Sequence, residues 1–416
     1  MNLKLRLTLV SFFQFFVWGA WLITIANYWF GKGIGNPSEF GKIFTTLGIS
    51  SIIMPALTGI IADRWINAEK LYGVLHLLSG VMICYLPQVN DPDSFFWVML
   101  LAMLFYMPTI ALSNSVAYHT LKNNAFDLVK VFPPIRVWGT VGFIVAMWIT
   151  NLSGSKATEM QFYISAAGSF FLGIYSFTLP ACKPNKGGGA KSFTEMFGLN
   201  AFSLFRNPKM AMFFLFAMML GAALQLTNMY GDRYVDNFKE VPEYANLFVV
   251  KYSTIIMSIS QISETLFILA IPFFLKRFGI KQVMLISMIA WVLRFGFLAY
   301  GDPAGGLWMI ILSCIVYGMA FDFFNISGSL FVETQTDSKI RSSAQGLFMM
   351  MVNGFGAVLG SYGSGYLIEK YFLNADQSFQ WKPIWLCFAA YALVIAILFA
   401  FLFKHKHTGE DLEVKH

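Results

Sequence analysis

The sequence predicts an all-α membrane protein with twelve transmembrane helices in two pseudo-symmetric six-helix bundles. The first observation is composition, because 57% of the 416 residues are hydrophobic and only 12% are charged, whereas a soluble domain has about 25% charged residues. The second is the length of the apolar stretches, and the third is a set of similar segments in the two halves. Together they indicate a helix bundle packed in lipid.

Apolar stretches long enough to cross a bilayer recur along the whole chain, and each crossing needs about 20 residues. A short basic segment precedes the first stretch, as in a signal peptide. That stretch is too long, however, and lacks a cleavage site with small residues, so an uncleaved first helix is predicted. We expect membrane-spanning helices at residues 6–30, 40–62, 69–88, 94–118, 135–153, 161–181, 208–230, 248–275, 281–301, 306–332, 342–371 and 383–404.

One internal connection, 182–207, is long, basic and rich in glycine, which favours a flexible cytoplasmic linker. It separates a predicted N-terminal bundle, 1–181, from a C-terminal bundle, 208–404, and a cytoplasmic tail, 405–416, follows. Lys and Arg are concentrated at the N-terminus, in alternate loops and at the C-terminus. The excess of positive charge on the cytoplasmic side of membrane proteins therefore places both ends in the cytoplasm.

The two predicted bundles resemble each other in sequence. The stretch Tyr106–Asn114 resembles Tyr317–Asn325, and Ile135-Arg136 matches Ile340-Arg341 at nearly the same spacing along the chain. Repeated halves of this kind are typical of transporters that work by alternating access around a central site.

The stretch Ser258–Leu275 carries Gln261 and Glu264 within an otherwise apolar run. A carboxylate at membrane depth costs roughly 2.5 kcal/mol or more and normally marks an ion or substrate path. Residues three apart share a helix face, so an amide and a protonatable acid lie together. This arrangement suits a polar solute whose movement is coupled to a proton. The alternative is a hydrogen bond between packed helices.

Three other predicted helices also carry polar or aromatic side chains on one face. Hydrophobic packing alone does not require four such faces. The residues are Gln225 and Asn228 in 208–230; Tyr317, Phe321 and Asn325, with Asp322 beside them, in 306–332; and Arg136, Thr140 and Phe143 in 135–153.

The loop Gly59–Arg64 resembles the signature loop of the major facilitator superfamily, although its usual continuation is replaced by Trp65–Lys70. Longer stretches are similar to the bacterial nucleoside permeases of the nucleoside–proton symporter family. The resemblance runs from the N-terminus to about residue 406, and it implies the major facilitator fold and proton-driven import of nucleosides across the inner membrane. The stretches are Phe132–Thr140, Met257–Phe267, Ala299–Pro303 and Tyr317–Gly328.

A nucleoside requires aromatic faces for its base and polar groups for its base edge and ribose. Stacking of a base on an aromatic ring contributes about 1–3 kcal/mol, and amides both donate and accept hydrogen bonds. The resemblance implies a pocket that includes Glu264. For the aromatic residues, packing against helices or lipid is the alternative. The expected substrate-binding residues are Gln225, Asn228, Gln261, Glu264, Tyr317, Phe321, Phe143, Thr140 and Asn325.

Two acids, Asp322 and Glu264, compete for the proton-coupling role. We hypothesise that Asp322 couples the proton through Arg136 and that Glu264 mainly holds substrate. The alternative for Arg136 is a cation that extends toward the cytoplasmic interface. For Arg294, within 281–301, the sequence suggests only such an extension or an ion pair with an outer acid.

Gln14 and Trp18, four apart in the first predicted helix, are further candidates for contact with the cavity. The four cysteines form neither a disulfide framework nor a metal-ligand pattern.

The leading functional hypothesis is a nucleoside–proton symporter, and a sugar or oligosaccharide symporter of the same superfamily is the alternative. A membrane enzyme or sensor is disfavoured, because no metal-ligand cluster, phosphate-binding loop or nucleophile–base motif occurs. We therefore expect no enzymatic activity, cofactor or metal. The expected partners are a nucleoside, a proton and the lipid bilayer, with no nucleic acid, and the chain is expected to be a monomer.

Overall fold

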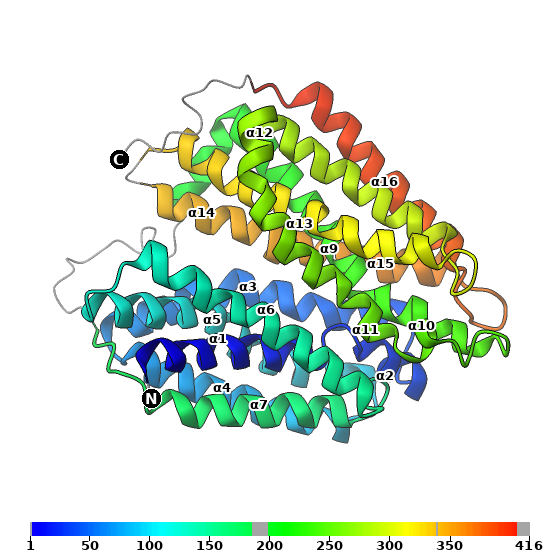
Figure 1. Cartoon of the computed structure of the whole chain (residues 1–416), viewed down its shortest axis with the longest axis horizontal. Helices are drawn as coiled ribbons and strands as arrows, with labels where there is room; N and C mark the ends of the chain where they lie inside the picture. The colour runs from blue at the N-terminus through cyan, green and yellow to red at the C-terminus, as the bar shows by residue number, and fades with distance from the viewer. Residues whose placement is uncertain (1, 185–198, 338–339, 406–416) are drawn as a thin grey trace. The chain divides into compact units, whose positions relative to one another are not determined.

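The computed structural model describes residues 2–184, 199–337 and 340–405, and these residues are helical apart from their connections (Figure 1). They form no β-sheet, since their one β-bridge, between Leu373 and Phe379, is isolated. The chain divides into two compact units, residues 1–197 and 198–416. Most of the predicted linker 182–207 and of the predicted tail 405–416 lies outside the described residues.

The N-terminal unit consists of helices joined by short connections, in which α1 packs against α6, α3 against α5, and α4 against both α5 and α7. Its elements are α1 (Leu3–Gly19), α2 (Ile25–Lys32), α3 (Pro37–Arg64), α4 (Ala68–Tyr85), η1 (Leu86–Gln88), α5 (Pro92–Asn123), α6 (Leu128–Leu152) and α7 (Met160–Ser176).

The C-terminal unit is also helical. In it, α12 packs against α13 and α16, and α9 packs against η4 and α15. Its described elements are η2 (Leu199–Arg206), α9 (Pro208–Asn237), η3 (Phe238–Glu240), α10 (Phe248–Lys251), α11 (Ser253–Met257), α12 (Ile259–Tyr300), α13 (Leu307–Gln335), α14 (Arg341–Met349), η4 (Met350–Gly356), α15 (Ala357–Tyr371) and α16 (Trp381–Leu402).

Several helices begin at a capping side chain. Asn36 and Glu39 form a reciprocal capping box at the start of α3, which satisfies backbone N–H groups that lack a partner in the first turn. The carboxylate of Asp91 accepts from the backbone N–H of Ser94 at 2.8 Å and starts α5. Asn207 caps α9 in the same way. These caps place the helix starts within a few residues of the predicted ones.

Every predicted spanning range overlaps helix, although several of these helices are broken or irregular. The range 6–30 contains the break between α1 and α2, and 342–371 contains the π-helix η4. The ranges 248–275 and 281–301 meet in α12, which bends at Gly279 with φ 77°. Glycine adopts this conformation without steric cost. Among the described residues, eight helical stretches are long and apolar enough to cross a membrane.

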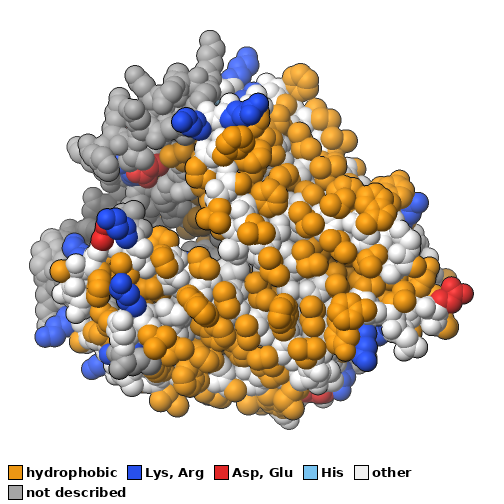
Figure 2. All heavy atoms as spheres, viewed as in Figure 1, with side chains coloured by type: hydrophobic (Ala, Val, Ile, Leu, Met, Phe, Trp, Pro, Cys, Tyr) orange, Lys and Arg blue, Asp and Glu red, His pale blue; other side chains and the backbone are white. Residues whose placement is uncertain are grey.

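The surface has the character expected of a protein in lipid. Figure 2 shows hydrophobic side chains spread over most of the visible face, with charged side chains mainly near its margins. Leu269 and Phe401, for example, are each 77% exposed. Exposed apolar patches of this extent are rare on soluble monomers, so contact with lipid explains them.

Helices inside each unit approach closely at glycines, as is common in membrane proteins. A side chain at Gly142 on α6 would overlap the backbone of Phe12 on α1, and one at Gly221 on α9 would overlap the backbone of Val352 in η4. These two close contacts hold α6 and α9, which carry predicted site residues, against their neighbours.

We therefore expect Gly221→Ala to lower the thermal unfolding temperature, because an added methyl group at a packed interface costs about 1–3 kcal/mol. Thermal unfolding of the detergent-purified protein measures the effect. Gly363→Ala is the matched control, since an added Cβ on Gly363 of α15 meets no atom within 4 Å. Equal melting temperatures for the two variants would contradict the assignment of Gly221 to a tightly packed contact between α9 and η4.

Candidate functional site

Three helices of the C-terminal unit carry most of the predicted site residues. Gln225 and Asn228 lie on α9, Gln261 and Glu264 lie on the first half of α12, and the aromatic and acidic residues near 317–325 lie on α13. Gln225 is 6% exposed, whereas Asn228 and Glu264 are partly exposed.

Several buried side-chain oxygens in the described part of this unit lack a hydrogen-bond partner, and three of them belong to predicted site residues. They are Oε1 of Gln225, Oε1 of Gln261 and Oδ2 of Asp322. A buried acceptor without a partner costs about 1–3 kcal/mol, so native structures leave few of them. Their occurrence on three helices that all carry predicted site residues is what a site for a polar ligand requires.

The aromatic residues of α13 form a flat platform, as their spacing predicts. The rings of Tyr317 and Phe321 are parallel to within 3°, with centroids 5.9 Å apart. Trp291 packs its ring edge-on against Tyr317 at 6.0 Å. Asn325 continues the same face and donates to the backbone oxygen of Phe321 at 3.0 Å. Tyr317 is 5% exposed and has Arg294 over its ring, whereas Phe321 is partly exposed, so Phe321 is the member of the pair more accessible to a planar base.

The two candidate acids, Glu264 and Asp322, lie within electrostatic range of each other and of Tyr317. Asp322 is 5% exposed. Two carboxylates in one low-dielectric region repel each other when both are ionised. The arrangement therefore suits a group that binds and releases a proton. The structure brings the two acids close to each other although they lie on different helices.

Arg294 was predicted to extend toward the interface or to pair with an outer acid, and both expectations are wrong. Its side chain is 0% exposed, so it does not reach an interface. Within the described residues Arg294 forms no ion pair, whereas Arg233 and Arg341 each pair with a carboxylate. The guanidinium group instead contacts neutral groups and the ring of Tyr317.

In the N-terminal unit, Arg136, Thr140 and Phe143 follow one another along α6, and all three are partly buried. The guanidinium of Arg136 lies 4.1 Å from the centre of the Phe15 ring on α1. The predicted link between Arg136 and Asp322 joins residues of different units, and it stays a prediction.

Gln14, a candidate for contact with the cavity, instead has a fully buried side chain. Its amide donates to Thr109 at 2.9 Å, and its amide oxygen accepts from the Tyr72 hydroxyl at 2.7 Å and lies 3.0 Å from Nε2 of His76. The other ring nitrogen of His76 lies 3.1 Å from Oγ of Ser169. Sequence reasoning missed this cluster, although the spacing of Tyr72 and His76 on one face of α4 was a usable signal.

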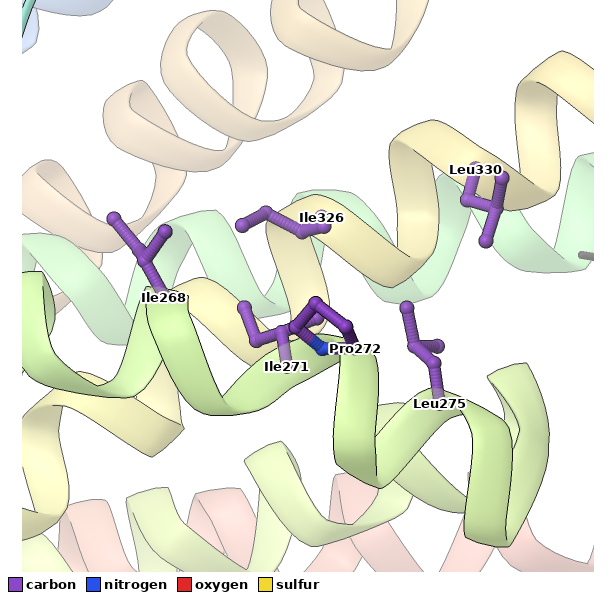
Figure 3. A pocket seen from close by; sticks show the side chains of 6 residues that line it. All are labelled: Ile268, Ile271, Pro272, Leu275, Ile326 and Leu330. Atoms are coloured by element: carbon purple, nitrogen blue, oxygen red, sulfur yellow. The ribbon is translucent and has the colours of Figure 1, made fainter. Parts of the chain in front are cut away.

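In the C-terminal unit, a groove of about 340 Å³ lies between α12 and α13, and Figure 3 shows its lining. It begins one turn beyond Glu264 on α12 and next to Asn325 on α13. Its lining is wholly apolar: Ile268, Ile271, Pro272, Leu275, Ile326 and Leu330. No cluster of His, Cys, Asp or Glu that is suited to a metal occurs in the described part of the chain.

Comparison with known proteins decides the family. The family model described as "Nucleoside H+ symporter" matches residues 1–408. This chain belongs to the nucleoside H+ symporter family. It is 51% identical to the xanthosine permease of Escherichia coli K12 over 99% of both chains, and 49% identical to that organism's nucleoside permease NupG over 98% of this chain and 97% of the permease.

Solved structures agree with membership of the nucleoside H+ symporter family. A crystal structure of the nucleoside transporter NupG matches with a TM-score of 0.91 and 48% identity, and covers 98% of this chain and 100% of the other. A structure of a mutant form matches with a TM-score of 0.94. More distant transporters share the fold, including a bacterial homologue of the lysosomal transporter Spinster, at 12% identity and a TM-score of 0.69.

Proposed function

We propose that this chain imports nucleosides together with protons by alternating access, in which one site opens first to one side of the membrane and then to the other. Membership of the nucleoside H+ symporter family carries this conclusion. The chain is a transporter, not an enzyme, and a multi-pass protein of the bacterial inner membrane. Twelve spanning helices, cytoplasmic termini and action as a monomer in the lipid bilayer complete the proposal.

The polar contribution to binding comes from the C-terminal unit. Gln225 and Gln261 offer their unpartnered amide oxygens to donors on the base edge or the ribose, and Asn228 adds donors and an acceptor from the same face of α9. Glu264 accepts from ribose hydroxyls, since a carboxylate at membrane depth is retained only where it has a polar task. Asn325 lies one turn beyond Phe321 on α13.

The aromatic contribution comes from both units. Tyr317 and Phe321 supply a parallel pair of rings for the base. We assign Phe143 and Thr140 of α6 to the same substrate, because they repeat with Arg136 along one face of their helix.

The proton is carried by Asp322, with Arg136 as its partner during the transport cycle, while Glu264 mainly binds substrate. The unpartnered Oδ2 of Asp322 and its proximity to Glu264 support this division. Protonation of Asp322 removes its repulsion with Glu264, so a proton favours the state in which Glu264 holds substrate.

A proteoliposome assay tests the function directly. Purified protein is given uridine, adenosine or xanthosine, with and without an imposed inside-negative potential and an inward proton gradient. A potential of 100 mV supplies about 2.3 kcal/mol per charge, so one coupled proton permits about fiftyfold accumulation. We expect accumulation of nucleoside only when the gradient is present.

Competition distinguishes the alternative substrate class. Unlabelled nucleosides are expected to inhibit labelled uridine uptake, whereas maltose and sucrose at the same concentration are not. Inhibition by the sugars, or uptake equal to that of protein-free liposomes, would refute nucleoside symport by this chain.

A further inference from the structure

Arg294 is a buried arginine in a membrane-spanning segment for which the proposed transport mechanism has no task. It lies in the second half of α12, and its side chain is 0% exposed. An arginine in this environment is costly and normally functional. No carboxylate in the described part of the chain pairs with it, so simple charge neutralisation does not explain its presence.

Its guanidinium group instead joins three helical segments. Nε donates to Oγ1 of Thr227 on α9 at 3.0 Å. Nη1 donates to the backbone oxygen of Ser313 on α13 at 2.7 Å and to Oγ of Ser260 in the first half of α12 at 3.3 Å. The hydroxyl of Ser313 in turn donates to the backbone oxygen of Arg294 at 3.0 Å.

On α9, the segment that Arg294 contacts also carries proposed binding residues. Thr227 lies between Gln225 and Asn228 in the sequence. With 3.6 residues per turn, Thr227 faces away from the side that these two amides share. Arg294 therefore holds α9 from behind its substrate-facing side.

On the other two segments, Arg294 contacts residues next to the proposed binding residues. Ser260 directly precedes Gln261 on α12, and Ser313 lies one turn before Tyr317 on α13. The guanidinium carbon of Arg294 is also 4.5 Å from the centre of the Tyr317 ring. One side chain thus contacts all three segments that carry proposed binding residues, and the face of one aromatic ring.

We propose that Arg294 is a positioning residue for nucleoside binding, which fixes the Tyr317 ring and keeps the polar rows of α9, α12 and α13 in register. This inference rests on the proposed nucleoside site. A role in stability alone is a poorer explanation, because burial of a charge is costly and no ionic partner in the described part of the chain offsets that cost. The planar guanidinium also stacks on aromatic rings and donates several hydrogen bonds at fixed angles, which lysine does not.

The test compares Arg294→Met and Arg294→Lys with wild type in proteoliposomes, by the Michaelis constant for uridine, the maximal rate per folded carrier and the unfolding temperature. We expect Arg294→Met to raise the Michaelis constant about tenfold, the size expected for loss of a desolvated cation–π contact. Arg294→Lys, which keeps the charge but not the planar group, should also raise it. The maximal rate and the unfolding temperature should change little.

The control is Arg277→Met, which removes an exposed arginine from the same helix α12 and should leave all three quantities unchanged. Combination with Tyr317→Leu adds a second readout. If Arg294 acts through the ring, Arg294→Met should have a smaller effect on the Michaelis constant in the Tyr317→Leu background than in wild type.

An unchanged Michaelis constant in both Arg294 variants, or a fall in unfolding temperature with normal affinity, would overturn the inference. If Arg294→Met does not fold, the Michaelis constant of Arg294→Lys tests the inference instead. Absence of nucleoside uptake by wild type would instead refute the proposed function, so the two failures are distinguishable.

Discussion

The Asp322→Asn variant is expected to lose proton-driven accumulation of nucleoside while it still exchanges nucleoside across the membrane. Asparagine has nearly the shape of a protonated aspartate and can donate a hydrogen bond, but it neither takes up nor releases a proton. The variant therefore mimics the protonated state permanently. Substrate can still bind and the site can still alternate, but the proton gradient is no longer linked to either step.

The expected size follows from the driving force. With 100 mV across the membrane, wild type can concentrate its substrate about fiftyfold per coupled proton, whereas Asp322→Asn should reach only the external concentration. Exchange of labelled for unlabelled uridine, measured without a gradient, should retain a rate close to that of wild type. It should also lose its dependence on pH.

Asp376→Asn is the matched control, because Asp376 is an exposed carboxylate of the same unit whose contact is a hydrogen bond with Ser378. It should accumulate nucleoside as wild type does. Accumulation by Asp322→Asn would exclude Asp322 as the coupling residue, and the parallel variant Glu264→Gln would then identify Glu264 if it alone lost accumulation.

The second large effect is expected at the aromatic platform of α13. Phe321→Leu should raise the Michaelis constant for uridine about tenfold or more, since base stacking contributes about 1–3 kcal/mol. The ring of Phe321 lies parallel to that of Tyr317, and leucine offers no flat face to a base. Binding of uridine to the purified protein, measured by calorimetry, should weaken by the same factor.

Trp308→Leu provides the control, because Trp308 lies on the same helix but is 55% exposed and contacts only the edge of Phe297 in the ring pairs described. Its replacement should leave affinity unchanged. Equal affinities for wild type and Phe321→Leu, at equal unfolding temperatures, would show that Phe321 packs against its neighbours instead of binding the base.

Much of the candidate site could be predicted from local spacing. Residues three or four apart share a helix face, so Gln261 with Glu264, and Tyr317 with Phe321, were identifiable as rows before any coordinates. The parallel rings on α13 follow the same rule. Local chemistry also located the helix starts, because the capping side chains of Asn36 and Asp91 act within one turn.

Local spacing does not reveal which neighbour a buried side chain faces. For Arg294, the sequence suggested either an extension to the interface or an ion pair with an outer acid, because the partners of a buried side chain are not visible within one helix. Its actual partners lie on other segments, 67 residues away at Thr227 and 34 away at Ser260. Gln14 was likewise expected at a cavity, but it meets Tyr72 and His76 on α4.

The sequence by itself determined a membrane-embedded helical protein, its polar rows and its family, because apolar length, helical periodicity and motif identity are properties of contiguous residues. Only the tertiary structure decided that Arg294 links α9, α12 and α13 and that Gln14 belongs to a buried cluster. The physical reason is that helix contacts depend on close approaches such as that of Gly221 to Val352, which bring together residues far apart in the chain.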